Sequence, residues 1–320
     1  MYHISRKIHE HIINTDNFLI IPHQNPDGDA LGSVGAIAQY LKQLNKNVKI
    51  FCATSFSNQL NYLPNIHLIH TDPGLFTDEN INTIIVVDSG DLAYAGIDKL
   101  IQKHHTTIIN IDHHYTNQEY GQYNLINKQA SSTTEVIYTY FKANQIHMDK
   151  DMATALLTGI VTDTGNFTNS ATSVSAINIA GHLLTKGANL NLINRKTLQN
   201  NTINILKLWG IVLDRLEYHA KKDVAYTYLT QKDLNKYGTD EKEAEGISNF
   251  MNTIGGVKIG LFLKETQDGK IKGSLRTTED NIDVSAIAQK MGGGGHKKAA
   301  GFTVEGSIQG VLDIVLTIIQ

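Results

Sequence analysis

The stretch His23-Gln24-Asn25-Pro26-Asp27-Gly28-Asp29 lies between an apolar run at residues 18–21 and a helix-like segment rich in small residues at 30–36. This pattern is typical of a strand, a turn and a helix, and the turn then holds one imidazole and two carboxylates. Such groups are costly to bury unless cations neutralise them. Histidine nitrogen and carboxylate oxygen together suit manganese, iron or zinc. Because Asn25-Pro26-Asp27-Gly28 is also good turn chemistry, this stretch alone leaves a metal site and an ordinary polar turn equally open.

The composition of the 320 residues is that of a globular protein with room for two domains, because 41% are hydrophobic and 18% are charged. A net charge of −3 argues against an extended groove for a polyanion, although a short anionic substrate remains compatible. Cys52 is the only cysteine, which excludes an intrachain disulfide and a thiolate metal cluster. No stretch approaches the roughly 20 apolar residues of a membrane span, and the first residues lack the apolar core of a signal peptide. We therefore expect a cytoplasmic protein.

Apolar, often β-branched segments alternate with segments of helical periodicity along the first half of the chain. The expected strands are residues 18–22, 48–51, 83–87 and 106–111, and the expected helices are residues 1–14, 30–44, 132–143, 149–161 and 173–186. This alternation predicts an α/β fold with a doubly wound, mainly parallel sheet. Ligands of such sheets lie beyond the carboxyl ends of the strands.

Three of the expected strands lead into acidic residues and histidines, and a further acid lies within residues 159–165. The candidate metal ligands at these places are His23, Asp27, Asp29, Asp88, His113, His114 and Asp163. One divalent ion takes about three or four protein ligands. This number of candidates therefore suits two ions, about 3.5–4 Å apart, that share a bridging carboxylate. Their common position at one edge of the sheet favours a metal site over solvated turns.

Residues 189–221 have a helical pattern with few turn signals, which we interpret as a helical linker. We therefore expect a catalytic, metal-binding domain at residues 1–188 and a smaller α/β, substrate-binding domain at residues 222–320. The expected elements of this second domain are strands at 224–229, 257–263, 270–276 and 302–304, and helices at 243–252, 284–290 and 310–319. Asp268-Gly269 between two of these strands is a hairpin signal.

A run of four glycines at residues 292–295 is followed by His296 in the second domain. Glycines permit positive φ angles and allow backbone N–H groups to approach an anion closely, and His296 adds a donor. Arg276 is a second candidate, since a guanidinium binds phosphate with two hydrogen bonds. The predicted substrate-binding residues are Arg276, Gly293, Gly294, Gly295 and His296. A flexible hinge and an exposed strand arginine are the alternative interpretations.

Four motifs, in this order, make the chain resemble the DHH phosphoesterases. They are the opening stretch, Val87-Asp88-Ser89-Gly90, the eponymous Asp112-His113-His114, and Thr162-Asp163-Thr164-Gly165. The glycine-rich residues 292–301 look like the signature of the DHH-associated C-terminal domain, so the resemblance covers essentially the whole chain. Within the family, the chain is most similar to the compact bacterial nanoRNase/pAp phosphatases, which are bifunctional oligoribonucleases.

The resemblance also implies a role for each candidate residue. It gives two sets of manganese ligands joined by one bridging carboxylate: His23 and Asp27 for one ion, Asp29, His113 and Asp163 for the other, and Asp88 between them. Such an ion pair lowers the pKa of a water and makes hydroxide available for in-line attack on phosphorus. His114 is expected to face the phosphate as a catalytic group, or to make only a structural hydrogen bond. Asp112 is expected to orient a histidine.

The function implied by the resemblance is that of a manganese-dependent hydrolase. Its expected substrates are short oligoribonucleotides (nanoRNA), cleaved to 5′-mononucleotides, and 3′-phosphoadenosine 5′-phosphate (pAp), cleaved to AMP and phosphate. Hydrolysis of cyclic di-AMP or its linear product pApA is the alternative, and a nucleotide-binding sensor without catalysis is a more distant one. We expect no long duplex nucleic acid and no membrane among the partners. Homodimers are common among such enzymes, but no sequence feature demonstrates one here.

Overall fold

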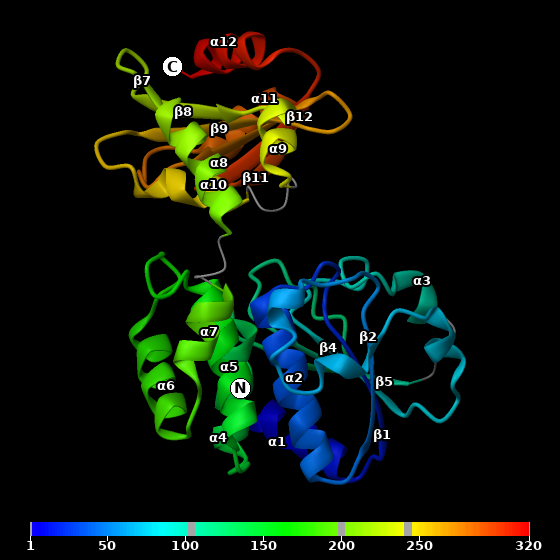
Figure 1. The fold of residues 1–320 in the computed structure, drawn as a ribbon. Coiled ribbons are helices and arrows are strands. Elements are labelled where there is room, and N and C mark those ends of the chain that lie inside the picture. Colours follow the sequence, from blue (N-terminus) through cyan, green and yellow to red (C-terminus); the bar gives the residue numbers. More distant parts are fainter. Residues whose placement is uncertain (1, 102–105, 198–201, 240–244, 320) are drawn as a thin grey trace. The chain divides into compact units, whose positions relative to one another are not determined.

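The computed structural model describes residues 2–101, 106–197, 202–239 and 245–319 (Figure 1). These fall into two compact units, Met1–Asn200 and Asn201–Gln320, which are described separately below. Among the described residues, no helix is both long and apolar enough to cross a membrane.

The first unit is built on a six-stranded sheet in the order β3-β2-β1-β4-β5-β6, and every neighbouring pair is parallel. Its strands are β1 (Asn17–Ile21), β2 (Asn47–Phe51), β3 (Ile69–His70), β4 (Thr83–Val87), β5 (Thr107–Asp112) and β6 (Tyr123–Ile126). The doubly wound parallel sheet predicted from the sequence is thus confirmed. The short edge strands β3 and β6 were not predicted.

Helices cover both faces of this sheet. They are α1 (Tyr2–Ile13), α2 (Gly28–Gln43), α3 (Asp98–Ile101), α4 (Thr133–Ala143), α5 (Lys150–Asp163), α6 (Val174–Thr185) and α7 (Leu190–Thr197), with short 3-10 turns at Asn58–Leu60, Ile66–Leu68 and Pro73–Thr77. Alternate strand residues belong to different apolar clusters: Leu19 and Ile84 to one, and Ile20 and Ile85 to the other. Since successive side chains of a strand point to opposite faces, both faces of the sheet are buried.

The helix that follows the opening stretch, α2, packs closely on α5. A Cβ atom at Gly32 would lie 2.5 Å from the carbonyl oxygen of Ala155, so this approach requires a glycine. The contact extends to Gly28, where a Cβ atom would lie 2.5 Å from Cγ2 of Thr162. This packing brings the acidic start of α2 beside the last turn of α5, which ends at Asp163.

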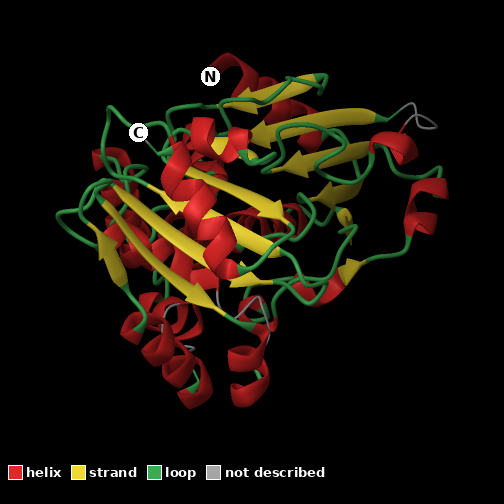
Figure 2. Cartoon of the chain, turned by 90° about the horizontal axis from the view of Figure 1, so that it is seen from above, coloured by secondary structure: helices red, strands yellow, loops and turns green. Residues whose placement is uncertain are grey.

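The second unit contains a mixed six-stranded sheet in the order β11-β12-β10-β9-β8-β7. Figure 2 draws the strands of the chain as yellow arrows and the helices in red. Its strands are β7 (Glu217–His219), β8 (Val224–Leu229), β9 (Ile259–Glu265), β10 (Ile271–Arg276), β11 (Gly294–His296) and β12 (Ala299–Val304), and its helices are α8 (Ile203–Asp214), α9 (Gln231–Tyr237), α10 (Glu245–Phe250), α11 (Val284–Lys290) and α12 (Ile308–Ile318), with a 3-10 turn at Met251–Thr253. Only the β8–β9 pair is parallel. Residues of α8, α9 and α10 share one apolar cluster, and residues of α11 and α12 share another.

The segment 189–221, which the sequence predicts to be a helical linker, contributes to both units. Ile193 of α7 lies in the core of the first unit, and Leu208 and Val212 of α8 lie in a core of the second. Residues 217–219 form β7, which pairs with β8. Residues 198–201 lie outside the described part of the chain.

Candidate metal centre

The polar groups that follow β1, β4 and β5 meet at the carboxyl edge of the first sheet. These three strands are neighbours in the sheet, and α5 adds Asp163 at the same edge. Three groups have ligand atoms within 4.8 Å of one another: His23, Asp27 and Asp88; Asp29, His113 and Asp163; and Asp88, His113 and His114. All seven metal-ligand candidates from the sequence therefore lie in these groups.

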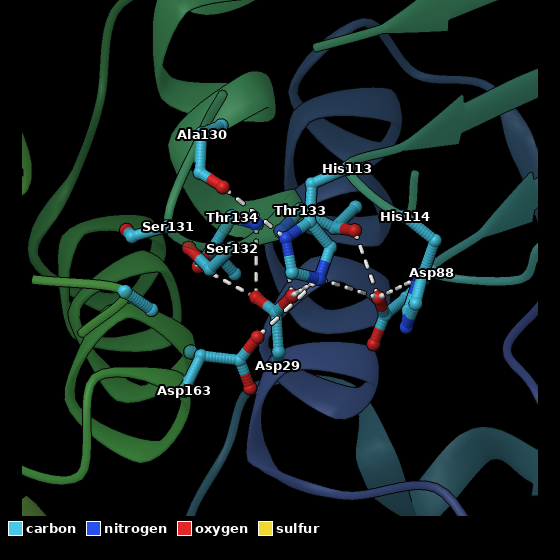
Figure 3. Close-up of polar contacts among 12 residues, drawn as sticks. Asp29, Asp88, His113, His114, Ala130, Ser131, Ser132, Thr133, Thr134 and Asp163 are labelled. Atoms are coloured by element: carbon cyan, nitrogen blue, oxygen red, sulfur yellow. Dashed lines mark hydrogen bonds and ion pairs between the residues drawn. The ribbon is translucent and has the colours of Figure 1, made fainter. Parts of the chain in front are cut away.

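Asp88 belongs to two of the three groups, and Figure 3 shows its carboxylate facing His113 and His114. Its Oδ2 is 3.6 Å from Nε2 of His23, and its Oδ1 is 3.7 Å from Nε2 of His113. Its backbone has a φ of +59°, in the left-handed region that few non-glycine residues adopt, and its side chain is buried. The strained turn after β4 thus directs one carboxylate toward two separate histidines.

Both of these histidines present Nε2 to the carboxylates. Nδ1 of His23 lies 2.8 Å from the carbonyl oxygen of Gln24, and Nδ1 of His113 lies 3.3 Å from that of Ala130. Because a carbonyl oxygen can only accept, each Nδ1 carries the proton that it donates. A backbone carbonyl that fixes one ring nitrogen in this way leaves the other nitrogen directed at the site, as in many metal-ligating histidines.

Asp29 is fully buried at the start of α2, and the N-terminus of α4 holds it. The backbone N–H groups of Thr133 and Thr134 donate to its two oxygens over 2.6 and 2.9 Å, and the Thr134 hydroxyl donates over 2.7 Å (Figure 3). The Thr133 hydroxyl donates to Oδ1 of Asp88 over 2.9 Å. The turn 133–134 therefore orients two of the carboxylates, a role that the sequence analysis missed.

Asp27 is the most exposed of the acidic groups. Its Oδ1 accepts from the backbone N–H groups of Asp29 and Ala30, each over 3.0 Å, and so caps the N-terminus of α2. The same oxygen lies 3.8 Å from Nε2 of His23. The carboxylate of Asp27 thus caps the N-terminus of α2 and also faces His23.

The crowding of carboxylates in this buried space has a large electrostatic cost. Burial, together with the charges of Asp29 and Asp88, raises the pKa of Asp163 to about 10. Burial and the charge of Asp88 likewise raise the pKa of Asp29 well above its ordinary value. Burial lowers the pKa of His23, but the nearby carboxylates of Asp27 and Asp88 outweigh it and raise that pKa to about 11. A set of oxygen and imidazole donors that would otherwise collect protons fits divalent cations.

His114 differs from the other two histidines. Its Nδ1 lies 2.8 Å from Oδ1 of Asp112, and its side chain is 41% exposed, compared with 17% for His113 and 6% for His23. The hydrogen bond from His114 to Asp112 raises the pKa of the imidazole to about 9. Asp112 is fully buried and also accepts from the side chain of Asn117, which the sequence analysis did not identify.

The predicted substrate-binding residues of the second unit are only partly brought together. A pocket of about 400 Å³ has Arg276, Gly294 and Gly295 in its lining, with Ser248, Lys272, Ser274, Ala299, Ala300 and Gly301. Gly293 instead packs against the backbone, since a Cβ atom there would lie 2.1 Å from the carbonyl oxygen of Gly301. His296 is exposed on β11, outside this lining.

Three of the polar side chains of this pocket come from alternate residues of β10. Lys272, Ser274 and Arg276 share one face of the strand, and Ile271 and Leu275 point into the core on the other. On the neighbouring strand β12, Ser274 is paired with Gly301. Lys272 and Ser274 are marked by no sequence motif, although the period of two along the strand places them on the same face as Arg276.

Comparison with known proteins identifies the class of this chain. The DHH family N-terminal domain matches residues 17–160, and the DHHA1 domain matches residues 221–320. The chain therefore contains a DHH family N-terminal domain followed by a C-terminal DHHA1 domain.

Two curated relatives align with most of the chain. A protein of Thermus thermophilus named bifunctional oligoribonuclease and PAP phosphatase NrnA is 27% identical over 288 residues, which cover 90% of this chain and 84% of the relative. A Streptococcus mutans protein with the same name, marked as probable, is 29% identical and covers 89% of each chain. The crystal structure of an exopolyphosphatase-related protein from Bacteroides fragilis has a TM-score of 0.91 over 100% of this chain and 96% of its own, at 23% identity, which supports the fold.

Proposed function

We propose that this protein is a phosphoesterase that uses two divalent metal ions, with manganese as the working ion. Its substrates would be short oligoribonucleotides, cleaved to 5′-mononucleotides, and pAp, cleaved to AMP and phosphate. The observation that carries the proposal is the position of Asp88, whose two oxygens face His23 and His113 separately. The names of the curated relatives support the substrate class.

The proposed ligand sets follow two of the three groups described above. His23 and Asp27 would hold one ion, Asp29, His113 and Asp163 would hold the other, and Asp88 would be shared. Such ions, when bound, supply hydroxide near neutral pH and neutralise charge on the phosphoryl group. The protein fixes the donors beforehand, through the carbonyls that hold both imidazoles and through the N-terminus of α4 that holds Asp29. This preorganisation removes the cost of reorienting the ligands during the reaction.

His114 is the proposed acid of the reaction. Because Asp112 raises its pKa to about 9, the imidazole carries a proton at neutral pH. Its Nδ1 is engaged by Asp112, so Nε2 of this partly exposed ring is the atom available to a phosphoryl or leaving oxygen. A cationic donor at that place would stabilise charge on phosphate and protonate the leaving group.

In the second unit, the proposed substrate site is the pocket at β10. Arg276 and Lys272 would bind phosphate there, and the small residues Gly301 and Ala299 leave room above the sheet. Gly294 and Gly295 would bring backbone groups to the same ligand. We also propose that Gly293 acts through the shape of this loop, and that His296 contributes a donor from the exposed strand β11. The chain has no overall basic charge, which favours short substrates over long duplexes. We also propose that the enzyme is cytoplasmic.

The test compares hydrolysis of pAp, pApA, cyclic di-AMP, a trinucleotide RNA and a long RNA, each with Mn²⁺, Mg²⁺ or EDTA. We expect turnover of pAp and the trinucleotide with Mn²⁺, none with EDTA, and loss of about a thousandfold in Asp88→Asn. The matched control is Asp16→Asn, which changes an exposed aspartate on the same unit. Tight nucleotide binding without turnover under any metal would instead support a sensor, and turnover of cyclic di-AMP alone would support the alternative phosphodiesterase.

A further inference from the structure

The aromatic ring of Tyr94 stacks on the imidazole of His23. The two ring centroids are 4.9 Å apart, and the planes differ by 17°. His23 is 5% exposed and Tyr94 is 49% exposed, so the tyrosine covers one face of the histidine while part of its own ring faces solvent. Neither the sequence pattern nor the four motifs draw attention to this tyrosine.

The loop that carries Tyr94 is fastened to the turn that carries His23. The backbone N–H of Gln24 donates to the carbonyl oxygen of Tyr94 over 3.0 Å, and the Gln24 side chain donates to the carbonyl oxygen of Ala93 over 3.0 Å. Within the loop, the backbone N–H of Tyr94 donates to Oδ1 of Asp91 over 2.7 Å. The stacked ring is therefore held by both segments and does not depend on the ring contact alone.

The hydrogen bond from Nδ1 of His23 to the carbonyl oxygen of Gln24 fixes one atom of the imidazole. It restrains the plane of the ring only loosely, because a hydrogen bond tolerates a range of angles and so permits some rotation about the Cβ–Cγ bond. A parallel aromatic neighbour restricts that rotation, and aromatic pairs favour stacked geometries of this kind. The plane matters because it decides whether the lone pair of Nε2 points between Asp27 and Asp88, which lie 3.8 and 3.6 Å away.

We propose that Tyr94 is a positioning residue for the metal site formed by His23, Asp27 and Asp88. It would act through its ring and not through its hydroxyl, by holding the imidazole plane in the orientation for metal binding. The inference rests on the proposed two-metal function and adds to it a residue that touches neither metal nor substrate. Partners of a metal ligand typically change metal affinity by about 10- to 100-fold when they are removed.

The experiment measures Mn²⁺ binding directly, by calorimetric titration and by the electron paramagnetic resonance signal of free Mn²⁺, in the absence of substrate. The variants are Tyr94→Ala and the conservative Tyr94→Phe. The matched control is Tyr115→Ala, because Tyr115 is another exposed tyrosine and directly follows His114. We expect Tyr94→Ala to weaken one of two Mn²⁺ sites about tenfold and to leave the other unchanged. Tyr94→Phe and Tyr115→Ala should both bind two ions as the wild type does.

The outcomes separate this inference from the proposed function. If the wild type binds no Mn²⁺, the two-metal function itself fails. If the wild type binds two ions and Tyr94→Ala binds them with the same affinities, only the positioning role is wrong. Weakening of both sites, together with a lower Tm of the metal-free protein, would show a general structural role and would also overturn the proposal. Weakening in Tyr94→Phe would show that the hydroxyl is the active group, contrary to the inference.

Discussion

The buried carboxylate of Asp112 accepts a hydrogen bond from Nδ1 of His114 over 2.8 Å, two residues further along the chain. The same oxygen also accepts from the backbone N–H groups of His113 and His114, so three donors of the turn after β5 share one acceptor atom. This contact raises the pKa of His114 to about 9 and engages Nδ1, so Nε2 is the nitrogen that Asp112 does not hold. The DHH motif is thus a small unit in which the acid orients the second histidine, while the first faces the metal groups.

Asp112→Asn should separate the protonation of His114 from the metal site. An amide cannot stabilise the imidazolium as a carboxylate does, so the pKa of His114 should fall from about 9 toward its ordinary value. Since the protonated form is lost as the pH rises through that pKa, the alkaline limb of the kcat profile should move to lower pH. We expect kcat at neutral pH to fall severalfold, because an imidazole with the ordinary pKa of 6.5 is only partly protonated there, and we expect the Mn²⁺ content to stay unchanged. Loss of bound manganese would show that Asp112 acts on the ligands and not on His114.

Asp163→Asn should make the metal-free protein more stable and the manganese-loaded protein less stable than the wild type. The pKa of Asp163 is raised from its ordinary value of 3.8 to about 10 in the folded state. Ionisation of this carboxyl group therefore destabilises the folded wild type increasingly as the pH rises between these two values. The stability advantage of the variant in EDTA should therefore grow as the pH rises. Thermal unfolding in EDTA measures the expected increase in stability, and thermal unfolding in Mn²⁺ measures the expected decrease. The control is Asp151→Asn in the exposed first turn of α5, which should change the stability by less than about 1 kcal/mol, and by the same amount in EDTA and in Mn²⁺.

Two glycines in helices of the same unit should respond to alanine in opposite directions. A Cβ atom at Gly159 would lie 2.3 Å from Oδ1 of Asp29 and 2.3 Å from the Thr134 hydroxyl. Gly159→Ala should therefore cost about 1–3 kcal/mol in the free energy of unfolding and weaken metal binding. At Gly181 a Cβ atom meets nothing within 4 Å, so Gly181→Ala should stabilise by about 0.5–1 kcal/mol. Urea unfolding measures both, and equal effects would contradict the close approach of α5 to Asp29.

The second unit should lose stability in acid through one ion pair. Arg215 donates to both oxygens of Asp233 over 2.5 and 3.0 Å, and although burial opposes it, this pair lowers the pKa of Asp233 to about 2. Because the folded pKa is lowered, the stabilisation is present above the ordinary pKa of 3.8 and disappears as the pH falls through about 2.

The variant Asp233→Asn should therefore be less stable than the wild type at neutral pH by about 1–2 kcal/mol, a range that allows for solvent screening of the partly exposed guanidinium. The difference should vanish near the acid end of a pH series of unfolding curves. Asp223→Asn provides the control, because its partner Lys258 is 57% exposed and lies 3.6 Å away. A constant difference between Asp233→Asn and the wild type across the series would contradict the role of this charge pair.

The sequence could predict which acidic residues and histidines lie close together, because these side chains follow recognisable strands. Asp88 and Asp112 end apolar, β-branched segments, and parallel strands place their carboxyl ends at one edge. The pairing of the long central strands was predictable for the same reason. Strand β3 consists of Ile69 and His70 alone, and so short a segment has no period that a sequence pattern could reveal.

The residues that hold the ligands were much harder to predict. Ala130 and Gln24 act through backbone carbonyls, which every residue type has, so their identity carries no signal. Thr133 follows a good N-cap, Ser132, but which carboxylate the start of that helix would meet depends on tertiary packing. The glycine run at residues 292–295 predicts an anion-binding loop, yet Gly294 and Gly295 belong to the edge strand β11, which pairs with β12, because glycine permits both conformations.

The order of the strands has a consequence for how the protein matures. β1, β4 and β5 lie side by side in the sheet but are separated by long intervening segments, and Asp163 is contributed later still by α5. An unfolded chain keeps these groups far apart, so it has neither their mutual repulsion nor their combined affinity for a cation. During synthesis, a nascent chain would acquire tight cation binding only after residue 163 has emerged and the two parallel pairings β1–β4 and β4–β5 have formed. Capture of the ions would then mark the moment at which the first unit is complete.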